Sequence, residues 1–309
     1  ILTTVFGLVA AIGLGTTQIE GGLSHLTSTT PGNLWLTIAL VFLICALAFF
    51  SAYAGVEKGI KRISTWNIFI TLLLLFFVFF QIDILVGLER FGISLYQYLI
   101  DFIPLSLALG TYDPGKEFLT NWTYYYWAFW LAWAPFTGIF IARISKGRTI
   151  REMILGVLLI PSLGSFFWFS IFGSASFDLI NQGTAYNEEF ENVFISIFRF
   201  FEYLPFSDLT NIVAVLLLVS FLVTSVDSAI FVLSMFSDKG KENPKRKFRL
   251  IWAVIILIFS EAIIVLGNVR PDSDVLTAMQ KFLIISSLPF AFFTAGIMVL
   301  FLRELIKKH

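Results

Sequence analysis

Eight apolar runs, each close to the length that crosses a lipid bilayer, dominate this sequence of 309 residues. An α-helix needs about 20 mainly apolar residues to span the hydrocarbon core, and only helices and closed barrels satisfy their backbone groups there. The chain has 58% hydrophobic and 14% charged residues. Soluble globular domains have about 45–50% apolar and about 25% charged residues, so this composition is not that of a soluble domain. We therefore predict an all-α polytopic membrane protein in which residues 1–309 form one transmembrane domain. The expected spans are residues 1–19, 34–55, 65–84, 119–142, 153–176, 209–236, 249–267 and 276–302.

Basic residues gather at alternate ends of successive spans. They lie at 58–62, 143–151, 239–249 and 303–308, whereas the connections at the other ends are rich in acids. Basic connections of multi-pass proteins usually face the cytoplasm. The pattern predicts a multi-pass protein of the plasma or inner cell membrane with a cytoplasmic C-terminus.

Two connections on the acidic side are too long to be simple turns. Residues 91–110 and 177–206 repeat apolar positions at helical spacing, which predicts amphipathic helices along the outer surface. Packing onto the bundle as a cap is the alternative to ligand binding for both.

An aromatic stripe occupies the fourth span. Trp122, Tyr126, Phe129, Trp130 and Trp133 follow one another at i, i+4, i+7, i+8 and i+11, so their rings are expected to share one helical face. Such rings can cage a quaternary ammonium group, because the face of an aromatic ring attracts a cation without a hydrogen bond. The alternative is an interfacial aromatic belt, which is common in membrane proteins.

Pro135 follows the stripe and removes one backbone donor. The carbonyl one turn earlier, near Leu131, is freed, and Gly138 loosens the next turn. A freed carbonyl at membrane depth is tolerated beside protein or a wet cavity, which favours a binding cavity next to Trp130 and Trp133. A kink that serves packing alone is the alternative.

In the first span, Gly13 and Gly15 form a small-residue face that favours close helix approach.

Short oxygen-bearing side chains cluster in the sixth span. Thr224, Ser225, Asp227 and Ser228 interrupt an otherwise aliphatic helix. Oxygen ligands suit a hard cation such as sodium, whereas single hydroxyls more often bond back to their own helix. A carboxylate inside a membrane span is energetically costly, so Asp227 is expected to be functional or paired with another group. Alternatively, it anchors its half of the helix.

These motifs together resemble one transporter family. The run at 141–152 reads Ile-Ala-Arg-Ile-Ser-Lys-Gly-Arg-Thr-Ile-Arg-Glu, and it accompanies the motifs at 135–138, 168–173 and 224–228. The sequence resembles the betaine/choline/carnitine transporter (BCCT) family over essentially its whole length. The resemblance implies a partial inverted five-helix-repeat fold, with these eight spans matching the last eight of the family's twelve.

The resemblance also implies roles for the aromatic stripe. Trp130 and Trp133 match the family's substrate-cage tryptophans, and Trp122 matches an outer aromatic residue on the access path. Phe129 stands where many members carry a tryptophan, which weakens that wall of the cage. With Tyr126, these residues form the expected substrate-binding set.

Sodium ligands follow from the same resemblance. Thr224 and Ser225 match hydroxyls that bind sodium in the family, and Phe221 contributes its backbone carbonyl. A second family site uses a threonine pair, of which Thr4 is present and Leu8 replaces its partner. Sodium is the one ion expected, with no other cofactor.

The expected function is sodium-coupled symport of a quaternary-ammonium solute such as glycine betaine, choline or carnitine by alternating access. A sodium-independent or proton-coupled exchanger, and a non-transporting sensor of the same ligands, stay open. An enzyme is not expected, because His25 and His309 stand with no nucleophile or metal-ligand partner. We expect a small solute and the bilayer as partners and no nucleic acid, and homo-oligomerisation stays open.

The chain begins at Ile1 inside an apolar run. We therefore expect the natural protein to start upstream, with the first four family helices and their glycine-rich substrate helix. The chain alone is not expected to transport.

Overall fold

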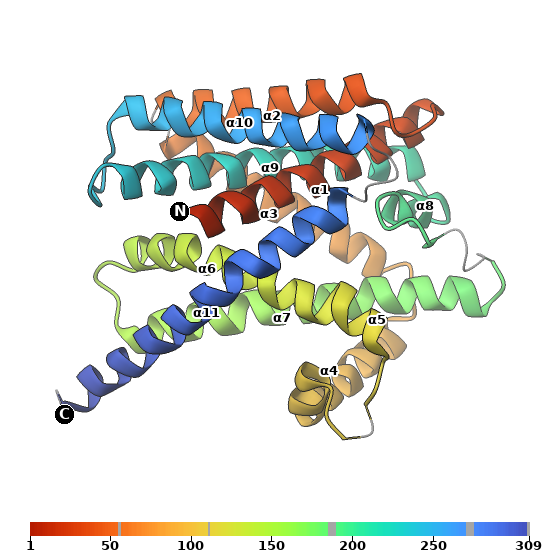
Figure 1. Cartoon of the computed structure of the whole chain (residues 1–309). Helices are drawn as coiled ribbons and strands as arrows, with labels where there is room; N and C mark the ends of the chain where they lie inside the picture. The colour runs from red at the N-terminus through yellow and green to blue at the C-terminus, as the bar shows by residue number, and fades with distance from the viewer. Residues whose placement is uncertain (55–56, 111, 185–189, 270–274, 308–309) are drawn as a thin grey trace.

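The computed structural model describes residues 1–54, 57–110, 112–184, 190–269 and 275–307, and these ranges are helical without a strand (Figure 1). His309 and the end of the basic tail at residue 308 lie outside them. The helical elements are α1 (Leu2–Thr27), α2 (Leu34–Ala54), α3 (Glu57–Phe79), α4 (Ile84–Leu107), α5 (Lys116–Phe118), the π-helical turn η1 (Leu119–Tyr124), α6 (Tyr125–Ile144), α7 (Ile150–Asn181), α8 (Ser196–Glu202), α9 (Ser207–Ser237), α10 (Arg246–Val269) and α11 (Val275–Lys307).

Eight stretches of the described residues are long and apolar enough to cross a membrane. They lie in α1, α2, α3, α5 to α6, α7, α9, α10 and α11, so the expected number of spans is confirmed. Several helices are longer than expected from hydropathy. The first continues to Thr27, and α7 runs over 32 residues, from Ile150 to Asn181.

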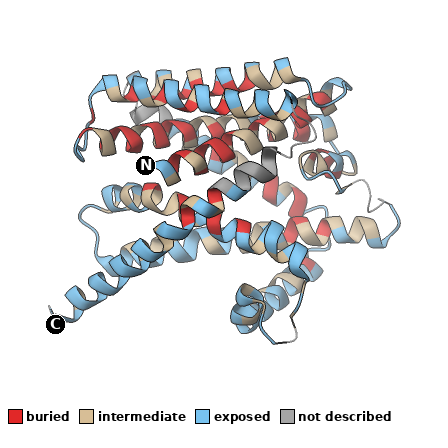
Figure 2. Ribbon diagram, viewed as in Figure 1, coloured by how far each residue is buried: buried red, intermediate tan, exposed pale blue. Residues whose placement is uncertain are grey.

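The centre of the bundle lies along α1 and α9, where buried residues are concentrated (Figure 2). On α9 the fully buried Val226, Ile230 and Leu233 recur at i, i+4 and i+7, so one apolar stripe faces the core. Gly15 of α1 brings the two helices close, because an added Cβ would lie 2.9 Å from the side chain of Leu222. The expected close approach is therefore present at Gly15.

The connections α6–α7 and α9–α10 and the C-terminal end of α11 gather at one end of the bundle, on the left of Figure 1. These places carry three of the four basic segments, so these three share an end, as their alternation predicts. At the α6–α7 turn Gly147 has φ +85°, a conformation that favours glycine. Thr149 then caps α7 reciprocally with Glu152: each side chain accepts a hydrogen bond from the other's backbone N–H.

Of the two long connections, the first forms the expected helix and the second does not. Residues 91–107 lie in α4, which begins at Ile84 behind the N-cap Asp83; its place on the outer surface stays a prediction. A long helix over 177–206 is wrong. Residues 177–181 are the end of α7, Gly183 turns the chain with φ +68°, and α8 covers only Ser196–Glu202 within the described part of this connection.

Candidate functional site

Aromatic side chains along η1 and α6 form a continuous series of ring contacts. Trp122 stacks on Tyr126 with ring centroids 6.0 Å apart, and Tyr126 meets Phe129 edge to face at 6.5 Å. Phe129 contacts both Trp130, at 5.6 Å, and Trp133, at 6.1 Å. The five residues of the expected substrate-binding set are therefore joined, with Phe129 between the two tryptophans.

The two tryptophans occupy different environments. The side of α6 that carries Trp130 is open, and this residue is 66% exposed. Trp133 packs against the main hydrophobic core, and its indole Nε1 is buried without a hydrogen-bond partner among the described residues. Gly7 of α1 lies against it, since a Cβ at this position would be 3.6 Å from the Trp133 Nε1 and 3.2 Å from the Ala132 Cβ. The absence of a side chain at Gly7 thus lets α1 approach α6 beside Trp133.

The backbone of this span differs from the expected helix, whose irregular turns were placed at Pro135 and Gly138. Residues Leu119–Tyr124 form a π-helical turn, which takes more residues per turn than an α-helix and occurs frequently at functional sites. Beyond it, α6 continues through Pro135 and Gly138 to Ile144 as an α-helix. Pro135 still leaves the Leu131 carbonyl without its helical donor, because proline has no N–H.

Four cavities lie away from this span: three between α4 and α7, and one beside the α1–α2 connection. A substrate cavity beside Trp130 and Trp133 stays a prediction.

The expected sodium ligands lie within two turns of α9. Thr224 donates a hydrogen bond from Oγ1 to the carbonyl oxygen of Phe221 at 2.9 Å, and Ser225 follows as a half-buried residue. This back-bond is the alternative that the sequence left open for the hydroxyl. In the part of the chain that the structure describes, no three His, Cys, Asp or Glu side chains form a group suited to a metal ion.

The second expected ion position is apolar on one side. Thr4 of α1 is buried, and its Oγ1 has no hydrogen-bond partner among the described residues. One turn later Leu8 is almost completely buried in the main core. Of the two positions that carry threonine in the family, one therefore has a hydroxyl, from Thr4, and the other has the apolar side chain of Leu8.

Asp227 is buried within α9, and its Oδ1 has no hydrogen-bond partner among the described residues. The positive charge that acts on it is Arg249 of α10. Arg249 in turn donates to the carbonyl of Ala52 and to Asn243, and its guanidinium lies 4.9 Å from the Phe231 ring. The charge of Arg249 favours a paired Asp227, and both this interpretation and the anchoring of its half of the helix stay predictions. On the same ring, Arg143 at the end of α6 lies at 4.7 Å, so the basic run links α6 to α9.

Several polar contacts escaped the sequence analysis because their partners are distant in the chain. Arg90 of α4 pairs with Asp178 of α7 at 2.8 Å, and Ser220 of α9 donates to Asn67 of α3 at 2.8 Å. Glu20, buried in α1, accepts hydrogen bonds from the backbone N–H of Gly32 at 2.9 Å and from Ser24. For each of these contacts, the sequence shows only a charged or amide side chain in or beside an apolar run, which does not identify the partner.

In its described residues the chain is helical with eight candidate membrane spans, an aromatic stripe and a hydroxyl-bearing central helix, an arrangement that fits a membrane transporter of solutes. The sequence model of the BCCT, betaine/carnitine/choline family transporter, matches residues 1–309. The chain therefore belongs to the BCCT family, a family of transporters and not of enzymes.

Curated relatives agree with this assignment. The chain is 36% identical over 292 residues to the glycine betaine transporter OpuD of Bacillus subtilis, covering 94% of this chain and 55% of the relative. It is 34% identical over 307 residues to a glycine betaine transporter of Acinetobacter baylyi, covering 98% and 44%. It is 32% identical over 310 residues to an ectoine/hydroxyectoine transporter of Virgibacillus pantothenticus, covering 99% and 60%. The chain thus spans about half the length of these relatives.

Proposed function

We propose that this chain forms part of the substrate path of a secondary transporter for glycine betaine or a related quaternary-ammonium solute, coupled to sodium. Family membership and the names of the glycine betaine relatives support the substrate class. In this fold family of inverted repeats, substrate and ion bind near the membrane midplane and rocking of one helix bundle alternates access. Choline and carnitine carry the same trimethylammonium group and belong to the same proposal.

The observation that carries the proposal is the series of ring contacts from Trp122 to Trp133. A trimethylammonium group binds within about 6 Å of an aromatic ring centroid, and tryptophan offers the strongest attraction. Trp130 presents an open indole, while Trp133 is held firmly by the core and by α1. In the proposed site the exposed ring receives the cation and the packed ring fixes its position.

Uptake of radiolabelled glycine betaine by cells that lack their own betaine uptake tests this function. Expression of the chain together with its expected upstream helices should give saturable betaine uptake that needs external sodium. Excess unlabelled glycine betaine, choline or carnitine should inhibit this uptake. Absence of uptake from a protein present in the membrane, together with uptake of an unrelated solute, would contradict the substrate class.

A second candidate, a sodium-independent or proton-coupled exchanger of the same solutes, has its own support. Leu8 stands where the second ion position has a threonine in the family, and Thr224 already has a hydrogen-bond partner in Phe221. Uptake that is unchanged when sodium is replaced by potassium, and that is driven by internal unlabelled solute, would favour this candidate over sodium symport.

We further propose that the basic connections and the C-terminus face the cytoplasm. Two of these connections and the C-terminal end of α11 lie at one end of the bundle (Figure 1), and their positive charge favours the cytoplasmic side.

A further inference from the structure

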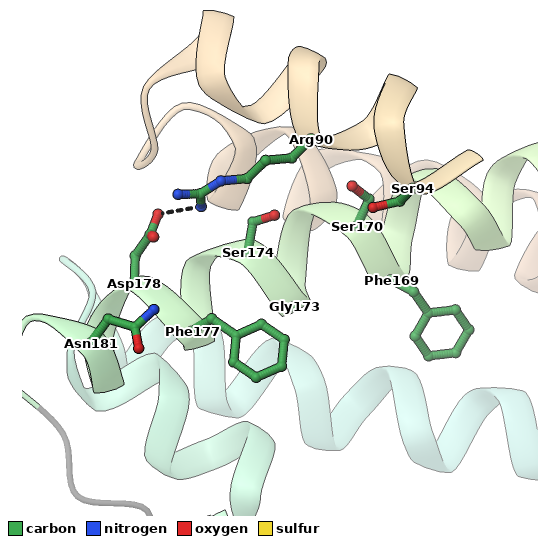
Figure 3. Close-up of a pocket in the computed structure, with 9 residues that line it drawn as sticks. All are labelled: Arg90, Ser94, Phe169, Ser170, Gly173, Ser174, Phe177, Asp178 and Asn181. Atoms are coloured by element: carbon green, nitrogen blue, oxygen red, sulfur yellow. Dashed lines mark hydrogen bonds and ion pairs between the residues drawn. The ribbon is translucent and has the colours of Figure 1, made fainter. Parts of the chain in front are cut away.

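A polar cavity of about 450 Å³ lies between α4 and α7 (Figure 3). Both helices contribute to it, α4 through Arg90 and Ser94 and α7 through residues between Phe169 and Asn181, its last four turns. The polar side chains that line it are those of Arg90, Ser94, Ser170, Ser174, Asp178 and Asn181. It is separate from the aromatic stripe of α6 and from the expected sodium ligands on α9, so the proposed transport function does not account for it.

Opposite charges stand side by side in this cavity. The guanidinium Nη1 of Arg90 donates to Asp178 Oδ2 at 2.8 Å, and the two side chains are 40% and 31% exposed. Arginine has five N–H donors and a carboxylate about four acceptor positions, so this single bond leaves most of both groups available. Glu89 is the other charged group that acts on Arg90. The pair therefore suits a ligand that carries one negative and one positive group.

Hydroxyl groups line the wall beyond this pair. Ser94 and Ser174 open onto the cavity, and the Oγ of Ser170 is buried there without a hydrogen-bond partner among the described residues. A buried hydroxyl without a hydrogen-bond partner destabilises the protein, and a ligand oxygen that accepts its hydrogen bond removes this cost. Phosphate and ester oxygens of a ligand would be suitable acceptors for these donors.

The polar cavity continues into an apolar groove of about 240 Å³ along the same two helices. The two share Ser94, Phe169 and Ser170 in their walls. Beyond these residues the groove is lined by Phe91, Leu95, Tyr98 and Phe166. A chamber with paired charges that leads into a ring-lined groove has the shape and chemistry of a site for an amphiphile.

The position along α7 places the charged chamber at the level of lipid headgroups. At about 1.5 Å per residue, the 32 residues of α7 extend to about 48 Å, whereas the hydrocarbon core is about 30 Å thick. Asp178 and Asn181 lie in the last turns of α7, beyond what the hydrocarbon core covers. The exposed ring of Phe169, more than two turns earlier on α7, also lines the apolar groove (Figure 3).

We propose that the α4–α7 cavity binds a zwitterionic phospholipid with a primary ammonium headgroup, as in phosphatidylethanolamine. Its phosphate lies at Arg90, its ammonium at Asp178, and one acyl chain follows the groove past Tyr98 and Phe166. A soluble zwitterion would use the charged pair but leave the adjoining apolar groove empty, which is why a lipid is the better fit.

Native mass spectrometry of the purified, delipidated protein in detergent tests the proposal. Phosphatidylethanolamine, phosphatidylglycerol with the same acyl chains, and a short-chain phosphatidylethanolamine are titrated separately, and glycine betaine is added as a competitor. Long-chain phosphatidylethanolamine is expected to bind more tightly than the other two lipids, and glycine betaine is not expected to displace it.

Three variants assign the binding to this cavity. Arg90→Gln is expected to weaken phosphatidylethanolamine binding about tenfold, the loss of one charge-assisted hydrogen bond. Ser94→Trp fills the passage shared by chamber and groove from an exposed position on α4, so it should weaken binding without removing a buried contact. Arg199→Gln is the matched control, because it breaks another exposed arginine–carboxylate pair, with Glu202 at 3.0 Å.

Each result decides the proposal. Weaker binding in Arg90→Gln and Ser94→Trp, with Arg199→Gln unchanged, supports it. Equal binding of phosphatidylglycerol, displacement by glycine betaine, or unchanged binding in both cavity variants overturns it. If Arg90→Gln does not purify as a single species, the lipid binding of Ser94→Trp decides between these outcomes by itself.

Discussion

The Oγ1 of Thr224 lies 2.9 Å from the carbonyl oxygen of Phe221, one turn earlier on α9. Two of the three expected sodium ligands are thus adjacent oxygens of a single helical turn. A hydroxyl that donates its proton keeps its lone pairs, and a carbonyl oxygen has two. Both atoms therefore still have lone pairs to offer a cation, and the back-bond holds the hydroxyl in place beside the carbonyl.

Thr224→Ala removes the hydroxyl from this turn and tests its role. The sodium concentration that gives half-maximal uptake is expected to rise by about tenfold, as for one lost charge-assisted contact, and the maximal rate should change less. The measurement is initial uptake of labelled glycine betaine across a sodium series. Ser234→Ala is the control, because Ser234 is also on α9 and bonds back to Ile230 at 2.6 Å. An equal effect of the two variants would assign Thr224 to helix packing.

Trp133 tests the aromatic cage. Trp133→Ala removes a ring held between Phe129 and Phe136 and is expected to weaken substrate binding about 30-fold, from a desolvated cation–π contact of about 2 kcal/mol. Trp133→Phe keeps a ring and should lose less. Binding of labelled betaine to the purified protein that includes the expected upstream helices measures both, with Trp35→Ala on α2 as an exposed control. Equal losses in the alanine and phenylalanine variants would argue against recognition by the ring face.

Gly7 tests whether the approach of α1 to α6 positions that ring. A Cβ at Gly7 would meet the Ala132 Cβ at 3.2 Å, whereas a Cβ at Gly13 of the same helix would have no neighbouring helix within 4 Å among the described residues. Gly7→Leu is therefore expected to cost about 1–3 kcal/mol by overpacking and to lower betaine affinity, and Gly13→Leu should leave both nearly unchanged. Thermal unfolding in detergent and betaine binding give the two readouts. A Gly7→Leu protein with normal affinity would separate Trp133 from this contact.

Local patterns in the sequence predicted those parts of the structure that depend on local physics. Apolar runs of bilayer length predicted eight spans, and the 3.6-residue period placed Trp122 beside Tyr126 and Phe129 beside Trp133. The π-helical turn before α6 was not predicted, because its hydrogen-bond register leaves no mark in the residue spacing.

Contacts between segments that are distant in the chain could not be predicted from the sequence, for a different reason. Arg90 and Asp178 are 88 positions apart. In the sequence, each is a single charged residue beside an apolar run, and nothing there indicates that the two form a pair. The approach of Gly7 to Trp133 depends on how two helices cross, which neither helix encodes by itself. For Thr224, the sequence offered a sodium ligand and a back-bond as alternatives, and the geometry contains the second without excluding the first.

The orientation of the bundle follows from labelling single cysteines introduced at its opposite ends. Lys241 lies in the basic α9–α10 connection, and Thr184 is an exposed residue after α7, near the other end of the bundle. The native Cys45 is buried, so it should contribute little background. With intact cells, a membrane-impermeant maleimide is expected to label Thr184→Cys, and Lys241→Cys only after the membrane is permeabilised, because basic connections stay in the cytoplasm. The opposite pattern would invert the proposed topology, and with it the side of the membrane on which the Arg90–Asp178 cavity meets the lipid headgroups.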